Sequence, residues 1–169
     1  MERTLMLVRH AKAGGGDGGG DADRPLTELG YEQCAIVARE MTGMGLDPDV
    51  ALVSTARRAE QTFKAMAAAT NWQVDPEPVR ELYSGYVEEV LDAVRAAPAG
   101  CATLMVVGHE PTMSATAWKL ASRGSAPDAV TRVRRGLPTA GVAVIQVDGE
   151  WASVGRGPTI LRWVLTPLA

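Results

Sequence analysis

Three apolar stretches of this chain each give way abruptly to charged or polar residues. They are residues 5–8 before Arg9-His10, residues 50–53 before Ser54-Thr55-Ala56-Arg57-Arg58, and residues 103–107 before Gly108-His109. Short, uniformly apolar runs are typical of parallel strands whose two faces are both covered. If these strands are neighbours, their carboxyl ends meet at one edge of a sheet, where α/β proteins bind ligands. The pattern therefore predicts that the two histidines of the chain and several arginines converge on one site.

Helical patterns separate these strands. We expect helices over residues 27–41, 56–69, 86–97 and 111–121, with Thr27 capping the first of them. Strands that alternate with helices predict a three-layer α/β/α sandwich with a mostly parallel central sheet. We also expect a hairpin of residues 140–147 and 151–154 that turns at Asp148-Gly149, and a short last strand at residues 163–165.

Three further segments have less regular patterns. Residues 13–23 are rich in glycine and predict a mobile loop, which lacks the Gly-Lys-Ser/Thr ending of a Walker-type phosphate loop. Pro76 and Pro78 indicate an extended connection. The run Arg132-Val133-Arg134-Arg135 is interpreted as a solvated helix or loop face, with contact to a substrate protein as the alternative.

A histidine beside an arginine at a strand end favours chemistry on a tetrahedral oxyanion. Guanidinium groups bind such anions through a fork of donors, and imidazole is a nucleophile or an acid near neutral pH. Arg9-His10, together with His109 at another strand end, therefore suits phosphoryl transfer through a phosphohistidine. The structural alternatives are that His10 caps a helix or lies in the core, and that Arg9 is an ordinary surface charge.

The motifs at the strand ends resemble those of the histidine phosphatase superfamily, which has the phosphoglycerate mutase-like fold. The matching segments are Arg9-His10-Ala11, the stretch Ser-Thr-Ala-Arg-Arg-Ala-Glu-Gln-Thr from Ser54 to Thr62, and Gly108-His109. The chain length and the segment Arg24-Pro25-Leu26-Thr27 are similar to the short SixA-type phosphohistidine phosphatases. The resemblance covers roughly the whole chain, and the set of ordered motifs is specific.

This resemblance implies roles for particular residues. The implied catalytic residues are His10, Arg9, Arg58 and His109, with Arg24 as a substrate ligand. Arg58, and not its neighbour Arg57, stands directly before Ala-Glu-Gln-Thr, where the family carries its arginine. The arginines would stabilise a metaphosphate-like transition state, so that neither a metal nor a cofactor is expected. They would also lower the pKa of His10 and keep it neutral for attack.

The general acid can be aligned in two ways. Larger family members carry a glutamate after the second helix, which protonates an alkoxide leaving group. One alignment puts Glu81 in this position, and the other puts Ser84 there and leaves no acid. The second resembles the short phosphohistidine phosphatases. It is chemically reasonable, because a phosphoimidazole whose distal nitrogen carries a proton leaves as neutral imidazole.

Three functions fit these motifs. The first is a phosphatase that removes phosphate from a phosphohistidine-bearing protein and releases inorganic phosphate. The second is a phosphomonoesterase acting on a small phosphorylated substrate, and the third is a non-catalytic module that binds phosphate or a phosphoprotein. No long inserted cap segment is present in the sequence, which favours an open site and hence a protein substrate, since enzymes of small molecules usually enclose them.

Composition sets the remaining expectations. A length of 169 residues suits a single histidine phosphatase domain over residues 1–169. The net charge of −3 gives no support for binding nucleic acid. No apolar run approaches the about 18 residues that span a bilayer, and no signal peptide precedes the first strand, so no membrane partner is expected. Cys34 and Cys101 lack metal-site spacing and are interpreted as core thiols of a cytoplasmic protein.

Overall fold

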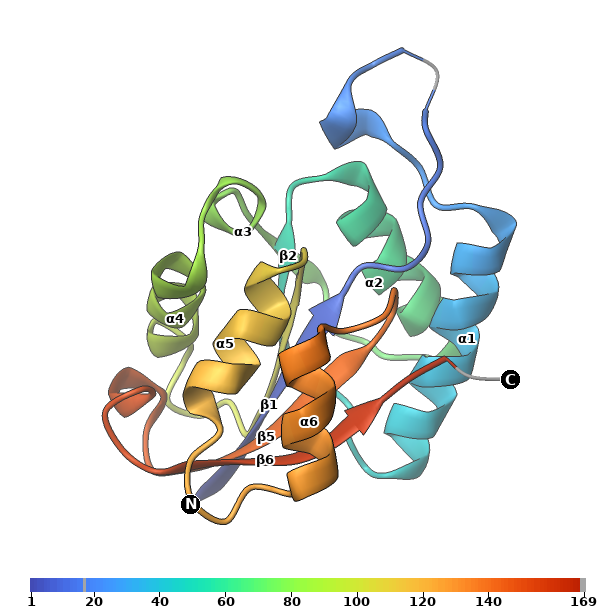
Figure 1. Cartoon of the computed structure of the whole chain (residues 1–169). Helices are drawn as coiled ribbons and strands as arrows, with labels where there is room; N and C mark the ends of the chain where they lie inside the picture. The colour runs from blue at the N-terminus through green and yellow to red at the C-terminus, as the bar shows by residue number, and fades with distance from the viewer. Residues whose placement is uncertain (17, 168–169) are drawn as a thin grey trace.

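A computed structural model describes residues 1–16 and 18–167. Its six strands form one sheet in the order β3-β2-β4-β1-β5-β6 (Figure 1). The strands are β1 (Glu2–Arg9), β2 (Val50–Ser54), β3 (Pro76–Val79), β4 (Thr103–Gly108), β5 (Val142–Asp148) and β6 (Thr159–Leu165). The helices are α1 (Glu28–Gly43), α2 (Arg57–Thr70), α3 (Glu81–Ser84), α4 (Val87–Arg95), α5 (Thr112–Leu120) and α6 (Pro127–Arg135), with short 3-10 helices η1 (Asp21–Asp23) and η2 (Trp151–Ser153).

The sheet is mostly parallel, as the sequence predicted. β1 pairs in parallel with β4, β4 with β2, and β2 with β3. Among the six strands of this sheet, β5 is the one that points in the opposite direction, and it pairs antiparallel with both β1 and β6. The carboxyl ends of β1, β2 and β4 therefore lie side by side at one edge.

Two helical layers cover the two faces of the sheet, which confirms the predicted α/β/α sandwich. Alternate residues of β1 point to opposite faces, as a strand requires. Leu5 and Leu7 pack in one core with apolar residues of α4, α5 and α6. Met6 and Val8 pack in the other core, with apolar residues of α1 and α2. Burial on both faces explains why β1 is apolar throughout its centre.

The first helix starts where the sequence predicted. The Thr27 hydroxyl accepts a hydrogen bond from the Gly30 amide at 3.1 Å, which caps the amino terminus of α1. Gly30 also lets α1 approach the chain that leaves β1, because a Cβ atom at this position would clash with the Lys12 carbonyl oxygen. The Thr27 amide donates to the same carbonyl at 2.9 Å. These contacts hold the segment that follows His10.

Two expectations about strands were wrong. Residues 76–79 form an edge strand, β3, rather than a plain connection; its prolines are tolerated because an edge strand leaves one side of its backbone unpaired. The expected hairpin partner, residues 151–154, is instead a 3-10 turn around the buried Trp151, whose indole nitrogen donates to the Cys101 carbonyl at 2.8 Å. The partner of β5 is β6, which begins several residues earlier than the predicted last strand.

The arginine run near residue 132 belongs to a helix that the sequence reading did not identify. Pro127 opens α6, and Ala129 and Val133 face the core one helical turn apart. Arg132, Arg134 and Arg135 are exposed, as the solvated-face interpretation expected. Among the described residues, no helix is both long and apolar enough to cross a membrane.

Candidate active site

His10 lies at the carboxyl end of β1, where the backbone fixes both its position and its tautomer. Its amide donates to the Gly108 carbonyl of β4 at 3.0 Å. The next amide, of Ala11, donates to the Thr62 hydroxyl at 2.9 Å, and the ring nitrogen Nδ1 of His10 lies 2.7 Å from the Ala11 carbonyl oxygen. Because a carbonyl oxygen only accepts, Nδ1 carries the proton and Nε2 carries the lone pair.

Arg58 joins the two histidines. It is the second residue of α2, and its guanidinium is almost fully buried. Nε donates to Nε2 of His10 at 3.3 Å, and Nη2 lies 3.4 Å from Nδ1 of His109. The two imidazole rings have centroids 5.2 Å apart. The structure thus brings together, at one sheet edge, three of the residues that the sequence predicted for the site.

Ser54 holds the second histidine in place. Nε2 of His109 lies 2.7 Å from the Ser54 hydroxyl oxygen, which also accepts a hydrogen bond from the Ala56 amide at 3.2 Å. Since a guanidinium only donates, Nδ1 of His109 accepts from Arg58 and Nε2 carries the proton. Ser54 ends β2, so the serine at the start of the second motif orients a histidine that comes from β4.

Burial and positive charge keep both imidazoles neutral. Loss of solvent lowers the pKa of His10 to about 4, helped by the nearby charges of Arg58, Arg9 and Arg24 and opposed by the hydrogen bond to Ala11. Burial likewise lowers the pKa of His109 to about 4, with further lowering by His10 and Arg58. At neutral pH the site therefore offers an uncharged imidazole nitrogen beside guanidinium groups.

The other two predicted arginines approach from different sides. Nη1 of Arg9 donates to the Leu137 carbonyl at 2.9 Å, and its buried Nε has no hydrogen-bond partner within the described part of the chain. Arg24 comes from the segment that precedes α1, and its Nε donates to the Gly14 carbonyl at 2.8 Å. Arg57 turns outward to Asp23, as expected for the neighbour of Arg58.

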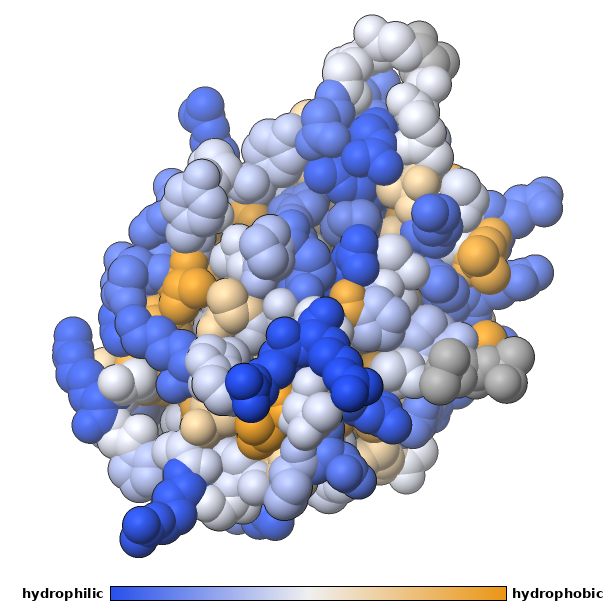
Figure 2. Space-filling model, in the orientation of Figure 1, coloured by the Kyte–Doolittle hydropathy of each residue, from blue (hydrophilic) through white to orange (hydrophobic). Residues whose placement is uncertain are grey.

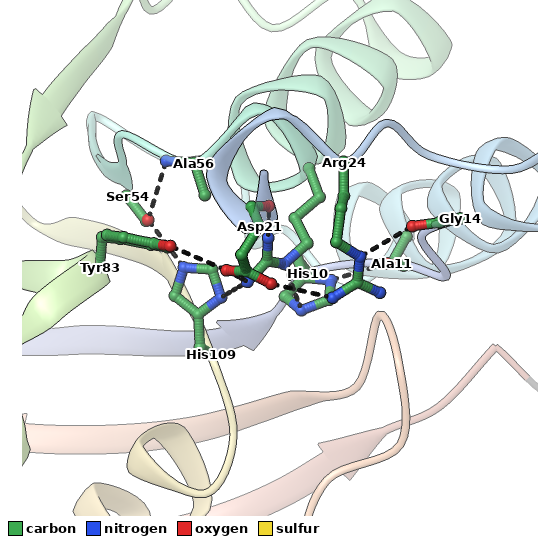
Figure 3. A network of polar contacts seen from close by, with 10 residues as sticks. His10, Ala11, Gly14, Asp21, Arg24, Ser54, Ala56, Tyr83 and His109 are labelled. Atoms are coloured by element: carbon green, nitrogen blue, oxygen red, sulfur yellow. Dashed lines mark hydrogen bonds and ion pairs between the residues drawn. The ribbon is translucent and has the colours of Figure 1, made fainter. Parts of the chain in front are cut away.

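Asp21 is a site residue that the sequence reading missed. One carboxylate oxygen lies 3.0 Å from Nη2 of Arg58 and 2.8 Å from the hydroxyl of Tyr83, and the other lies 3.2 Å from Nη1 of Arg24. Its backbone carbonyl also accepts from Nη1 of Arg58 at 2.8 Å. Figure 3 shows this carboxylate between the Tyr83 hydroxyl and the Arg24 side chain.

Asp21 was not predicted as a site residue because it lies in the glycine-rich stretch. Residues 13–23 were expected to form only a mobile loop, but Asp21 belongs to the 3-10 helix η1, and the arms of the stretch are joined by a bridge between Ala13 and Leu26. Asp17 lies outside the described residues. The available signal was the spacing of Asp21 three residues before Arg24, which allows the two side chains to pair across one turn.

Tyr83, rather than Glu81, reaches the site from α3. The Tyr83 ring meets the His109 ring edge-on, with centroids 5.6 Å apart, and its hydroxyl donates to Asp21. This hydrogen bond lowers the pKa of Asp21 to about 2, helped by Arg58 and Arg24. Glu81 is exposed in the first turn of α3. The geometry thus offers a phenol where the first alignment expected a carboxylic acid.

Gln61 and Thr62, the last residues of the second motif, hold the neighbouring chain segments in place through hydrogen bonds. The Gln61 side-chain oxygen accepts from the Leu26 amide at 2.8 Å, which fixes the segment that carries Arg24. Thr62 accepts from Ala11 and donates to the Arg58 carbonyl at 2.7 Å. Within residues 1–16 and 18–167, no group of three or more His, Cys, Asp or Glu side chains is placed to hold a metal ion.

Comparison with known proteins agrees with this arrangement. A family model described as the histidine phosphatase superfamily (branch 1) matches residues 5–97, more than half of the chain. An uncharacterized protein of Mycobacterium tuberculosis (strain H37Rv) is 36% identical over 151 residues, which cover 89% of this chain and 93% of that protein.

Two solved structures have the same fold. One, assigned as a phosphohistidine phosphatase SixA from Nakamurella multipartitia, is 33% identical with a TM-score of 0.84, covering 100% of this chain and 98% of its own. The other, the protein histidine phosphatase SixA complexed with tungstate, is 25% identical with a TM-score of 0.77 and 97% coverage of each chain. The chain therefore belongs to the histidine phosphatase superfamily and is similar to its SixA-type members.

Proposed function

We propose that this protein is a phosphatase that removes the phosphoryl group from phosphohistidine on another protein, through a phosphohistidine intermediate on His10. The observation that carries the proposal is the neutral His10 ring, whose Nδ1 proton is held by the Ala11 carbonyl and whose Nε2 lone pair points at the guanidinium of Arg58. A phosphoryl group bound by Arg9, Arg24 and Arg58 would lie directly before this lone pair.

In the first step, Nε2 of His10 attacks phosphorus and a new N–P bond forms. The N–P bond of the substrate breaks, and its electron pair returns to the substrate imidazole. Guanidinium groups of Arg58 and Arg9 stabilise the negative charge on the equatorial oxygens, as preorganised donors do in a low-dielectric site. His109 donates its Nε2 proton to the Ser54 hydroxyl and accepts a hydrogen bond from Arg58 at Nδ1, so it helps to hold the Arg58 guanidinium beside the phosphoryl group.

In the second step, water attacks phosphorus and the bond to Nε2 breaks. The electron pair returns to Nε2, while a proton of the water passes to the departing phosphate. Because Nδ1 of His10 keeps its proton through the hydrogen bond to Ala11, His10 leaves as neutral imidazole. The leaving group of the second step is then chemically the same as that of the first, and neither needs an enzyme acid.

The missing acid favours phosphohistidine over an alkyl phosphate. An alkoxide leaving group needs a proton donor, which typically contributes 10²–10⁴-fold in rate by rough estimate. Glu81 is exposed, and the carboxylate that does reach the site, Asp21, has a pKa of about 2 and is ionised at neutral pH. A neutral imidazole leaves without such help. Three arginines supply the charge that Mg²⁺ supplies in other phosphoryl-transfer enzymes, so the proposed reaction is independent of metal.

A basic surface supports a protein substrate. Arg132, Arg134 and Arg135 are exposed at the carboxyl-terminal end of α6, where Figure 2 shows strongly hydrophilic side chains. The chain then turns toward the site, since the Leu137 carbonyl accepts a hydrogen bond from Arg9. A protein presenting acidic residues around its phosphohistidine would meet these cations, whereas a small molecule would not reach them. The two buried free thiols agree with a cytoplasmic setting.

The proposal is tested by measuring kcat/KM for a phosphohistidine-bearing protein, free phosphohistidine, p-nitrophenyl phosphate and sugar phosphates, with EDTA present throughout. We expect the highest value for the phosphohistidine-bearing protein and no loss in EDTA. A higher value for a sugar phosphate would assign the protein to the small-molecule phosphomonoesterases. No hydrolysis of any of these compounds would favour a binding module.

A further inference from the structure

The Asp21 carboxylate accepts hydrogen bonds from the same arginines, Arg58 and Arg24, that bind the phosphoryl group in the proposed function. In the proposed reaction, the phosphoryl oxygens bind Arg58 and Arg24. In the structure, one carboxylate oxygen of Asp21 is bound to Nη2 of Arg58 and the other to Nη1 of Arg24, at 3.0 and 3.2 Å. A planar carboxylate and one face of a tetrahedral oxyanion make the same paired contacts to guanidinium groups. The two anions therefore compete for the same hydrogen bonds.

We propose that Asp21 is an intramolecular competitor of the phosphoryl group: its carboxylate binds Arg58 and Arg24, yields to the bound phosphoryl group and returns as phosphate leaves. This inference rests on the proposed function, because it assumes that Arg58 and Arg24 bind the phosphoryl oxygens. It adds a residue that sets the affinity for substrate and product without taking part in the bonds that form and break.

The setting of Asp21 suits an exchangeable ligand. Its side chain is 51% exposed, whereas that of Arg58 is 8% exposed. A carboxylate that faces solvent can leave its arginine at small cost, because water replaces the lost hydrogen bonds. Arg58 is fixed by its hydrogen bonds to the two histidines and stays in place for the incoming anion. The exchange therefore involves the short helix η1, not the strand ends.

Competition has a consequence for turnover. A site with three arginines and no counter-charge would hold dianionic phosphate tightly and would be slow to release it. Asp21 lowers that affinity, because each binding event must first break its contacts to Arg58, Arg24 and Tyr83. The same contacts re-form as the product departs. Substrate binding weakens as well, and a protein substrate can offset this loss through contacts outside the phosphoryl site.

The test is the affinity for tungstate, a tetrahedral dianion used here as the probe, measured by calorimetry at pH 8. Asp21→Asn keeps the shape of the side chain and removes its charge, so we expect tungstate to bind about tenfold more tightly than to the wild type. The matched control is Asp23→Asn, which removes a carboxylate from the same short helix. This carboxylate pairs with the outward-turned Arg57 at 3.8 Å and not with Arg58 or Arg24 in the described structure, so we expect no change.

Two further results separate the outcomes. If Asp21 instead positions Arg58, Asp21→Asn will bind tungstate more weakly; this result, or an unchanged affinity, overturns the inference. Arg58→Ala should lose tungstate binding, and if it does not, the proposed oxyanion site itself is wrong. A crystal structure of the wild-type protein with tungstate should show Asp21 away from Arg58. Tungstate bound elsewhere in the site, with Asp21 still on Arg58, would also overturn the competition.

Discussion

The candidate site has two parts that differ in how the chain holds them. The part at the sheet edge contains His10, His109 and Arg58, which come from the ends of β1 and β4 and the start of α2. His10 and Arg58 are buried, and His109 is half-buried. The part above it contains Asp21 and Arg24, whose side chains are 51% and 35% exposed. Both parts meet at the guanidinium of Arg58, which is hydrogen-bonded to both imidazoles below and to the carboxylate above.

This difference separates chemistry from access. Buried groups keep fixed geometry and shifted pKa values, which nucleophilic attack and charge stabilisation require. Exposed groups on connecting segments exchange partners with little cost and can respond to a ligand. In this protein, the same arginine serves both purposes, so substitutions in the two parts should have effects of different size and, at Asp21, of opposite sign.

The largest effect is expected at the nucleophile. His10→Ala should abolish turnover of every phosphorylated substrate, because it removes the imidazole nitrogen that accepts the phosphoryl group in the proposed mechanism, and His109 is held away by hydrogen bonds to Ser54 and Arg58. The fold should persist, since the substitution removes one partly polar side chain at a strand end and leaves both apolar cores intact. Circular dichroism would verify the fold, and residual turnover in a folded variant would remove the covalent mechanism.

Arg58→Ala should cost on the order of 10²-fold or more in kcat/KM, the scale for losing one preorganised electrostatic donor. The matched control is Arg57→Ala, because Arg57 is in the same turn of α2 but points away from the site, toward Asp23. Steady-state kinetics on phosphohistidine would measure both variants. Equal losses in the two variants would mean that general surface charge, rather than the fork of Arg58, binds the phosphoryl group.

The two histidines should titrate far below their ordinary range. Burial, with help from the arginines, lowers the pKa of each from 6.5 to about 4, so both rings stay neutral down to about that pH in the folded protein. The unfolded chain binds these protons at a higher pH, so stability should fall as the pH drops from 6.5 towards 4. Imidazole resonances in an NMR titration would report the midpoints directly, since the chain has only two histidines. Midpoints near 6.5 would contradict the buried, neutral site.

The smallest effect is expected at Glu81. Glu81→Gln should change kcat/KM on phosphohistidine by well under tenfold, because its side chain is exposed on α3 and the leaving imidazole carries its own proton. A general acid would instead be worth about 10²–10⁴-fold. A large loss in a folded variant would assign Glu81 a proton-transfer role and shift the substrate class towards alkyl phosphates.

The part of the site at the sheet edge could be predicted from the sequence, and the upper part could not. An apolar strand that ends in a polar residue leaves that residue at the carboxyl edge whatever the loops do, which is why His10 and His109 could be expected near each other. Asp21 follows a glycine-rich stretch with no periodicity, and its position depends on a long-range pairing with Arg58. A contact between residues so far apart in the sequence produces no local sequence pattern, so the spacing of Asp21 three residues before Arg24 was the one available indication.

The same contrast holds for the fold. β1, β2, β4 and the helices α1 and α2 have strong local patterns and lie where the sequence predicted them. β3 was missed because its prolines argue against a strand unless the strand is at an edge. Trp151 was expected in a strand, but its burial and its hydrogen bond to the Cys101 carbonyl bend the chain into a 3-10 turn. Tertiary contacts overrode the local hairpin pattern there.

The most direct test of the account is to trap the phosphoryl enzyme. Wild-type protein mixed with a radiolabelled phosphohistidine substrate and quenched within one turnover in alkali should carry an acid-labile, base-stable label, located by peptide mass spectrometry on His10. The His10→Ala variant should carry none. Label on another residue, or hydrolysis with no label on the protein during the first turnover, would contradict a mechanism in which the neutral Nε2 of His10 accepts the phosphoryl group.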